Sequence, residues 1–348
     1  MPLLLLLLLV ACSPVRLTDT TRLAPDLLGA DPGHLATPYV VGASFSIVLS
    51  TPKDPAGWTL EATDPDVLAV GEGEIDRDED GDGTLTFPVT AVCVGSVELV
   101  VHDREGAEAL RADARVAAPT RAELRSASDL ELDPTAPALS LPKVLVGGTA
   151  AFRVDFFDGD TPLAGAGGLV ATAGSGLVLE DKSTFPTDSD WLVITPSEPG
   201  TLTLDLATGG ADAGSVSLEA VDTSVVAGIT VDRDEEAGAE DGDSLQVLAI
   251  LEDSAGAEIY GASFTWTAGG EALDAPGDVF TYTFDASEAT VVEVATGDLS
   301  ETVTVHGRGG DVSDTSNVAC AVANVGPVGV AVLLAAMGAV RRRRATKA

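Results

Sequence analysis

The feature that most constrains the fold of this chain is an alternation of apolar and polar residues that occurs three times as a pair of neighbouring segments. In the first pair the alternating apolar residues are Val97, Leu99 and Val101, then Leu110, Ala112, Ala114 and Val116. A period of two over both segments predicts an antiparallel β-hairpin with one buried face and one solvated face. Such a hairpin cannot bury its apolar face alone, so each pair requires a second sheet.

Similar pairs close two further regions of the chain. Their apolar positions are Leu202, Leu204, Leu206, Val216, Leu218 and Ala220 in the second region, and Val292, Val294, Val303 and Val305 in the third. Earlier segments with strand character, which can supply the facing sheets, are 44–49, 58–62, 150–156, 192–194, 245–251, 264–267 and 280–284. Helical periodicity is almost absent before Cys320. Short strands punctuated by Gly and Pro predict an all-β fold of three tandem immunoglobulin-like β-sandwiches.

These patterns divide the chain along its length. We expect a signal peptide at 1–11, an N-terminal linker at 12–34, sandwiches at 35–118, 119–224 and 225–307, a linker at 308–317, a transmembrane helix at 318–340 and a basic cytoplasmic tail at 341–348.

The segments around two tryptophans support the same fold class. Residues 58–70 (WTLEATDPDVLAV) resemble the central tryptophan strand and following turn of bacterial Ig-like repeats, and residues 264–267 (FTWT) are similar in the third sandwich. The resemblance extends poorly to the second sandwich, where Trp191 occupies a different place. We expect Trp58 and Trp266 to fill the core between two sheets; the alternative is a surface platform for a carbohydrate or another ligand.

The N-terminus has the pattern of an export signal. The apolar run at 3–11 is too short to cross a membrane and is typical of the central region of a signal peptide. Leu9-Val10-Ala11-Cys12 resembles the lipobox of bacterial lipoproteins, which implies that Cys12 becomes the lipidated first residue of the mature chain. Ser13 then favours the outer membrane. No Lys or Arg precedes the run, and an ordinary cleaved signal peptide is the alternative.

The C-terminus has the pattern of a membrane anchor. Residues 318–340 carry no charge, and as a helix they would extend roughly 35 Å, enough for a hydrocarbon core of about 30 Å. The arginines at 341–344 belong on the cytoplasmic side, so the preceding residues are exported. A cysteine, an apolar helix and an arginine cluster in this order resemble the Myxo-CTERM class of sorting signals, although Gly326-Pro327 interrupts the helix. The resemblance implies processing near Cys320 and transfer to the cell surface; an uncleaved anchor is the alternative.

Charge and cysteine content limit the function classes. The chain has 19 Lys and Arg, five of them in the tail, against 55 Asp and Glu, so the exported part carries a net charge of about −41. Such a charge repels nucleic acid and anionic lipid and favours cations. With Cys12 and Cys320 in the sorting signals, Cys93 has no disulfide partner. Because Cys93 continues the alternation of Leu85, Phe87, Val89 and Ala91, we expect it to be buried.

One segment has the pattern of a calcium loop. Asp76, Asp78, Asp80 and Asp82 alternate before Gly83, and carboxylate oxygens around a tight glycine turn suit Ca²⁺. Position twelve of the best register is Val89 instead of the bidentate Glu, so we expect a weak site with a Kd of about 10⁻⁴ to 10⁻³ M, or an acidic loop without metal. The acidic residues between Asp232 and Asp243 have a looser spacing.

Catalytic motifs are absent from the sequence. The only histidines are His34, His102 and His306, and none lies in a hydrolase or metalloprotease motif. We therefore expect a cell-surface-anchored structural or adhesin-like component of the bacterial envelope and not an enzyme. Its expected partners are the membrane and a surface protein or glycan. The alternative is an accessory lipoprotein that binds a glycan or a cation.

Overall fold

The computed structural model describes residues 15–21, 35–50, 54–77, 83–181, 189–233, 244–273, 279–283 and 290–305. Almost all regular structure in these residues is β-strand, so the predicted all-β class is confirmed. Within them there are also one short α-helix, α1 (Ala127–Leu132), and one 3-10 helix, η2 (Thr223–Val225).

The first part of the molecule contains two sheets. Their strands pair antiparallel, except for one short parallel pair at the edge of the second sheet. One sheet consists of β1 (Arg16–Asp19), β3 (Ser44–Ser50), β7 (Gly83–Ala91) and β5 (Leu68–Val70) in this order, with β6 (Glu74–Arg77) also paired to β7. The other consists of β2 (Tyr39–Val40), β9 (Glu108–Ala117), β8 (Gly95–His102) and β4 (Thr59–Ala62). The β8–β9 pair is the predicted hairpin, with Val97 opposite Ala114 and Leu99 opposite Ala112. The apolar faces of both sheets belong to one buried core.

The second part contains a small sheet and one half of a large sheet. The small sheet contains β10 (Arg121–Ser126), β12 (Ala150–Asp158), β16 (Asp190–Pro196) and β15 (Leu177–Leu179), with β13 (Thr161–Pro162) on β12. The large sheet begins with β14 (Leu169–Ala173), β17 (Gly200–Thr208), β18 (Ala211–Val221) and β11 (Lys143–Leu145). The second predicted hairpin is β17–β18.

The third part continues the same large sheet. After β11 the sheet runs through β21 (Glu258–Tyr260), β20 (Ser244–Asp253) and β19 (Val226–Arg233), with β24 (Val279–Thr283) paired to β20. The facing sheet contains β23 (Glu271–Leu273), β22 (Thr265–Ala268), β25 (Thr290–Thr296) and β26 (Leu299–Val305). The pair β25–β26 is the third predicted hairpin, and Trp266 lies in the core between the two sheets.

Two features of the fold are not evident from the sequence. Residues 16–19, which the sequence predicts to be linker, form β1, which buries Leu17 and places Asp19 under the Tyr39 hydroxyl at 2.7 Å. A four-residue strand is too short for its period to be seen in the sequence. The second and third parts also share one eight-stranded sheet, because β11 pairs in parallel with β18 on one side and with β21 on the other.

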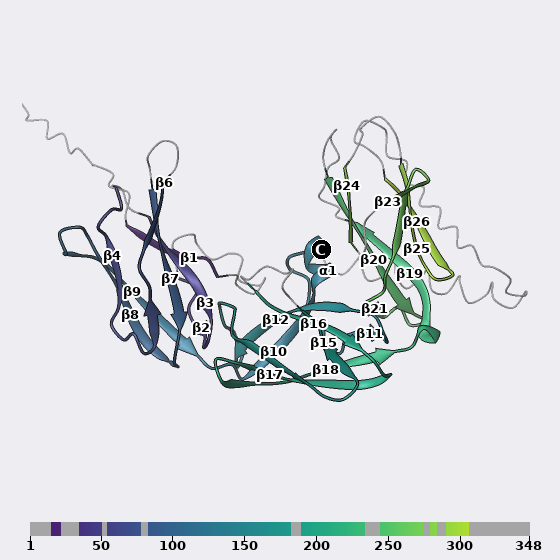
Figure 1. Ribbon diagram of the computed structural model, residues 1–348, viewed down its shortest axis with the longest axis horizontal. Helices are drawn as coiled ribbons and strands as arrows, with labels where there is room; N and C mark the ends of the chain where they lie inside the picture. The colour runs from purple at the N-terminus through teal and green to yellow at the C-terminus, as the bar shows by residue number, and fades with distance from the viewer. Residues whose placement is uncertain are drawn as a thin grey trace, which may run out of the picture.

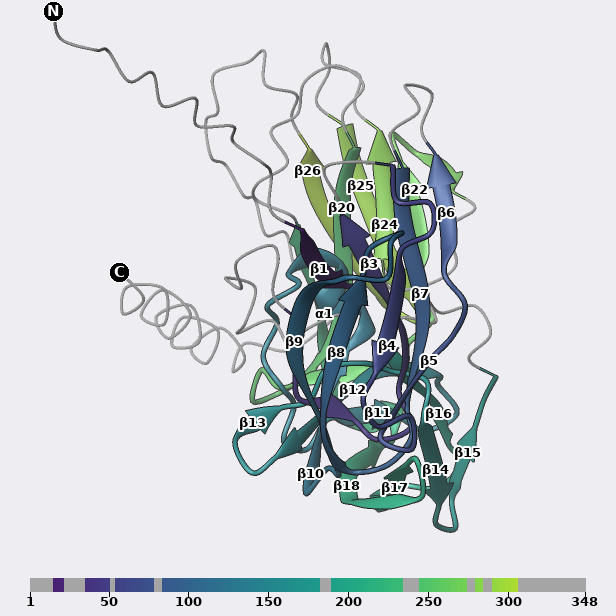
Figure 2. The ribbon, with the colours of Figure 1, turned by 90° about the vertical axis from the view of Figure 1, so that its left-hand side faces the viewer.

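The three parts form a bent molecule. In Figure 1 the second part lies across the bottom, and the first and third parts rise from its two ends toward the same side. Figure 2, turned by 90°, agrees, because β17 and β18 lie below the upright strands of both other parts.

Backbone contacts join the first part to the second. Val40 N donates to Ala164 O at 2.9 Å, and Ser44 N donates to Ala166 O at 2.8 Å. The buried Thr208 hydroxyl donates to Val41 O at 2.9 Å. Beside it Gly42 has a φ of +88°, and a Cβ at Gly42 would lie 2.6 Å from the backbone of Gly209.

We expect Gly42→Ala to weaken this junction, because the new methyl group would overlap the Gly209 backbone. The left-handed φ costs an alanine about 1–2 kcal/mol, and the overlap adds about 1–3 kcal/mol. Gly106→Ala is the matched control, since Gly106 has a φ of +79° but no atom within 4 Å of the position that a Cβ would take. Chemical unfolding measures both variants. Equal losses of unfolding free energy would contradict a close approach at Gly42.

Candidate functional site at the junctions of the second part

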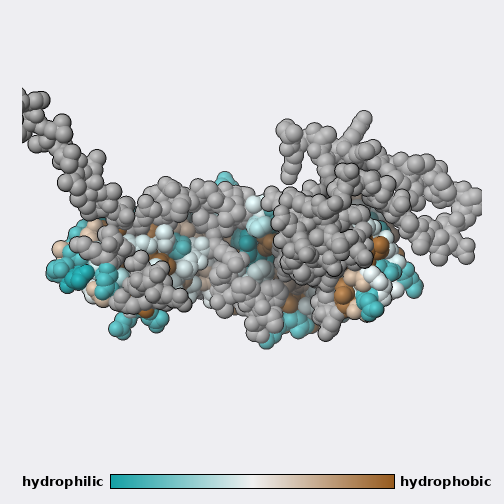
Figure 3. Space-filling model, turned by 90° about the horizontal axis from the view of Figure 1, so that it is seen from above, coloured by the Kyte–Doolittle hydropathy of each residue, from teal (hydrophilic) through white to brown (hydrophobic). Residues whose placement is uncertain are grey.

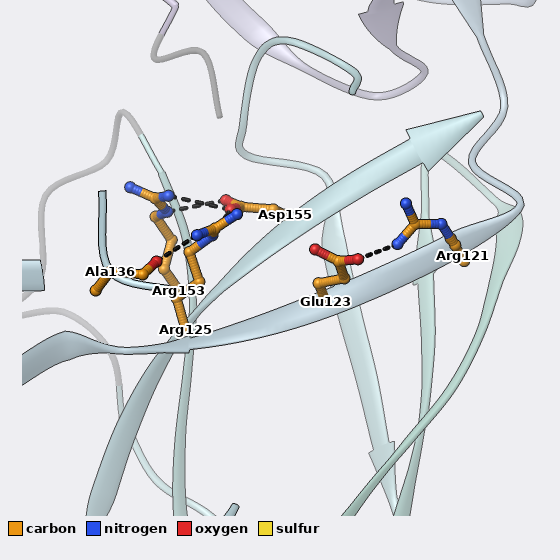
Figure 4. A network of polar contacts seen from close by, with 6 residues as sticks. All are labelled: Arg121, Glu123, Arg125, Ala136, Arg153 and Asp155. Carbon is orange, nitrogen blue, oxygen red and sulfur yellow. Dashed lines mark hydrogen bonds and ion pairs between the residues drawn. The ribbon is translucent and has the colours of Figure 1, made fainter. Parts of the chain in front are cut away.

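A buried ionic cluster lies on the face of the small sheet in the second part. Arg125 on β10 and Arg153 on β12 are directly opposite each other, and Asp155 accepts hydrogen bonds from both (Figure 4). Arg125 Nε lies 2.7 Å from Asp155 Oδ2, and Arg153 Nε lies 2.9 Å from Asp155 Oδ1. The Arg125 guanidinium also donates to Ala136 O. The three side chains are between 5% and 12% exposed.

The cluster depends on its single carboxylate. Two like charges directly opposite on neighbouring strands repel, and burial deprives them of water. Asp155 offsets this repulsion by accepting from both guanidinium groups, and such charge-assisted bonds are the stronger ones in proteins. The cluster therefore fixes β10 against β12, next to the segment that carries α1.

Another basic group ties the first part to the second. The Arg115 guanidinium on β9 lies 2.9 Å from the Asp158 carboxylate at the end of β12. Nearby, the Arg121 guanidinium lies 4.0 Å from the centre of the Phe157 ring, a cation–π contact, and it also pairs with Glu123. The chain has few basic residues, and these arginines make contacts between its own strands.

Helix α1 connects the second part to the third. Its first turn is capped by Ser126, whose side chain accepts from Asp129 N at 3.3 Å. The Tyr260 hydroxyl on β21 lies 3.0 Å from Asp129 Oδ2 and 2.6 Å from Glu258 Oε2. A phenol has one proton, so it donates to one carboxylate at a time. Burial, followed by the charge of Asp129, raises the pKa of Tyr260 well above its usual range.

Strand β11 adds an ion pair across the same junction. Lys143 Nζ lies 2.5 Å from Asp253 Oδ2 on β20 and 3.9 Å from Glu219 Oε2 on β18. The Lys143 hydrogen bond, together with the N–H groups of Ala257 and Ala255, lowers the pKa of Asp253 to about 2. Both partners of the Lys143–Asp253 pair are therefore charged at neutral pH.

A shallow polar hollow of about 460 Å³ lies on the first part, over β8 and β9. Its lining residues are Thr37, Thr63, Ser96, Val97, Glu98, Asp113, Ala114 and Arg115. Glu98 and Asp113 face each other across the two strands. The hollow offers hydrogen-bonding groups of both charges, and no aromatic ring lines it.

Most predicted site residues lie outside the described residues. These are Cys12, Asp78, Asp80, Asp82 and Cys320, together with the whole segment 318–340. The backbone of Asp76 lies in β6, opposite Thr84 on β7, so the candidate calcium segment connects two paired strands. In the part of the chain that the structure describes, no three His, Cys, Asp or Glu residues are grouped as a metal site. No helix there is long and apolar enough to cross a membrane.

The expectation that Cys93 is buried is wrong, because its side chain is exposed. Strand β7 ends at Ala91, and the turn that follows breaks the alternation before it reaches Cys93. Trp266 is 1% exposed, as expected of a core residue, and Trp58 is half-buried against the core of the first part. Trp191 is also buried.

Sequence reasoning missed the cluster of Arg125, Arg153 and Asp155. A signal was present in residues 152–156 (FRVDF), where two charged residues alternate with apolar ones. That alternation predicts a solvated outer face, whereas the side chains on this face are buried.

The fold and its junctions define the general class of this chain, an all-β protein made of several packed sheets. No family model matches the sequence, and no curated protein matches it. Among solved structures, the Escherichia coli adhesin FdeC is similar with 12% identity and a TM-score of 0.25, over 85% of this chain and 97% of that chain.

Two other solved structures are similar at the same low level. Domains 4–9 of the surface layer protein SbsC match with 14% identity and a TM-score of 0.34, over 84% of this chain and 47% of that chain. Yersinia pseudotuberculosis InvD matches with 12% identity and a TM-score of 0.22, over 84% of this chain and 96% of that chain. Scores this low carry no inference about activity or partners.

We expect Asp155→Ala to lower the unfolding free energy by about 3–5 kcal/mol, because it leaves two buried guanidinium groups without their carboxylate. The control on the same strand is Asp158→Ala, which removes an exposed ion pair and should cost about 0–1 kcal/mol. Denaturant unfolding of both variants measures the difference. Similar small losses in the two variants would show that the cluster contributes little to stability.

Proposed function

We propose that this chain is an exported, cell-surface-anchored protein that acts as a structural or adhesin-like component of a bacterial envelope. In this proposal its three parts are immunoglobulin-like sandwiches. The observation that carries the proposal is that hydrogen bonds between backbone groups cross both junctions, at Val40–Ala164 and along β11.

Rigid junctions suit a protein that bears load or that holds a binding surface away from the cell. Domains joined by flexible linkers move relative to one another by default. Here a shared sheet, a shared core and the Tyr260–Asp129 contact hold the parts in fixed positions. A surface protein built in this way presents its far end at a fixed distance and direction from its anchor.

The aromatic residues favour this role over ligand capture. Two of the three tryptophans are buried and Trp58 is half-buried, so none forms an exposed platform for a sugar ring. The exposed large apolar side chains in the described ranges are all Ile, Val or Leu. Seen from above, the described residues at the left-hand end of the molecule are mostly hydrophilic, and those at the right-hand end are a mixture of hydrophilic and hydrophobic residues (Figure 3).

The anchoring part of the proposal rests on the terminal sequences. A lipid on Cys12, processing near Cys320, or both would attach the chain to the outer membrane or the cell surface. A surface protein or a glycan is the partner class that we propose, and nucleic acid is disfavoured by the net charge of −36.

A second candidate function is the binding of a glycan or a cation by an accessory lipoprotein. The polar hollow lined by Thr63, Glu98, Asp113 and Arg115 favours it, since its side chains can donate and accept hydrogen bonds. The absence of an aromatic wall makes it the weaker of the two proposals.

We expect the chain to be exposed on intact cells that express all 348 residues. Proteinase K added to such cells should remove the signal of an antibody raised against residues 83–181, while a cytoplasmic marker in the same cells stays intact. Protection of the chain until the cells are permeabilised would contradict a surface location.

We further propose that Ca²⁺ binds Asp76, Asp78, Asp80 and Asp82. At calcium concentrations tenfold above the Kd, binding should stabilise the fold by about 1.4 kcal/mol, which thermal unfolding with Ca²⁺ or with EDTA measures. Asp80→Ala combined with Asp82→Ala should abolish the shift. The control Glu72→Ala with Glu74→Ala removes the same charge nearby and should retain it. Equal behaviour of the two variants would contradict the site.

A further inference from the structure

Strand β1 begins at the end of the first part that faces away from the second part. The neighbouring strand β3 starts at the junction, where Ser44 N donates to Ala166 O, and it ends at Ser50. Arg16, the first residue of β1, pairs opposite Ser50. At about 3.3 Å per residue, the start of β1 therefore lies roughly 20 Å from Ser44 along the strand direction.

Strand β26 ends at the corresponding end of the third part. Strand β21 lies at the junction beside β11, and β22 starts five residues after it. β25 runs antiparallel to β22, and β26 runs antiparallel to β25 and ends at Val305, opposite Thr290. Figure 2 agrees, because β26 lies high above β17 and β18 of the second part. The last described strand thus leads away from the junction.

The two ends of the described chain lie on the same side of the molecule. The first and third parts rise from the second part toward one side (Figure 1), so the start of β1 and the end of β26 both lie there. The two predicted attachment sites are close to these ends in sequence, since Cys12 is four residues before Arg16 and Val318 is thirteen residues after Val305. At up to 3.6 Å per residue, these segments reach at most about 14 Å and about 47 Å.

We propose that both ends of this chain attach to one membrane, through a lipid on Cys12 and through the anchor at or after Cys320. The molecule then stands as an arch, with the first and third parts as its legs and the second part outermost. This inference rests on the proposed surface anchoring. The net charge of −36 disfavours a molecule that lies flat on anionic lipid. In the arch the exposed Thr201 and Thr203 on β17 lie on the outermost sheet.

Cleavage of the chain between its two anchors tests the arch. A recognition site for a specific protease is inserted after Gly106, in the exposed turn between β8 and β9, because exposed loop tips tolerate insertions. Membranes from cells that express the full chain are treated with the protease and washed with urea, which separates the two fragments. Both fragments should stay with the membranes. A second chain with the site after Gly270, in the turn between β22 and β23, should give the same result.

The matched control is the same chain without residues 318–348. Its fragment after Gly106 should appear in the urea wash, while the fragment before Gly106 stays with the membranes. Release of one fragment from the full chain would overturn the arch and leave a protein with a single anchor, as the proposed function allows. Release of both fragments would contradict the proposed function as well.

A second measurement compares the distances of the three parts from the membrane. Glu105 and Glu271 are exposed residues in or next to the turns that face away from the second part, and Thr203 is exposed on β17. Each is changed to Cys separately in the Cys93→Ser chain and labelled with a fluorescent donor, and the membrane carries an acceptor lipid. After subtraction of the signal of the Cys93→Ser parent, energy transfer should be higher from positions 105 and 271 than from position 203. Equal transfer at the three positions, or a steady fall from the first part to the third, is incompatible with the arch.

Discussion

The pairing of β11 with two parallel neighbours is the interaction on which the arrangement of the second and third parts depends. Three residues, Lys143 to Leu145, lie between β18 and β21 and convert two half-sheets into one sheet. Buried backbone groups require partners, so this strand cannot be removed without leaving the donors and acceptors of β18 and β21 unpaired. The Lys143–Asp253 ion pair and the Tyr260–Asp129 contact then form around a junction that the backbone already fixes.

The junction between the first and second parts uses a different device. Gly42 and Gly209 allow two turns to approach within the space that a single methyl group would fill. The close approach brings the Thr208 hydroxyl to Val41 O and joins the apolar cores of the two parts. Both junctions thus hold neighbouring parts in one arrangement, whereas separate domains could move independently. The proposed structural role rests on this fixed arrangement.

Much of the fold was predictable because its strongest signal is local. The three closing hairpins, and strands such as β3, β12 and β20, follow from alternation within a few residues. Short strands such as β1 and β11 were not predictable, since three or four residues cannot display a period. The spacing of Cys93 continues that of β7 and so predicts a core position, although the strand ends two residues earlier.

The sequence by itself determined the all-β class, the position of the hairpins and the acidic character of the chain, because period and composition are properties of neighbouring residues. Only the tertiary structure decided that Arg125, Arg153 and Asp155 form a buried cluster, that the second and third parts share a sheet, and that β14 is left at an open edge of the described sheet. The cluster and the shared sheet join residues that are far apart along the chain. The open edge of β14 depends on the strand order of the sheet, which no single segment of sequence contains. No local pattern records which strands pair, because the backbone groups that join them are the same in every residue except proline. The ionic cluster in turn depends on the pairing of β10 with β12, which brings Arg125 opposite Arg153.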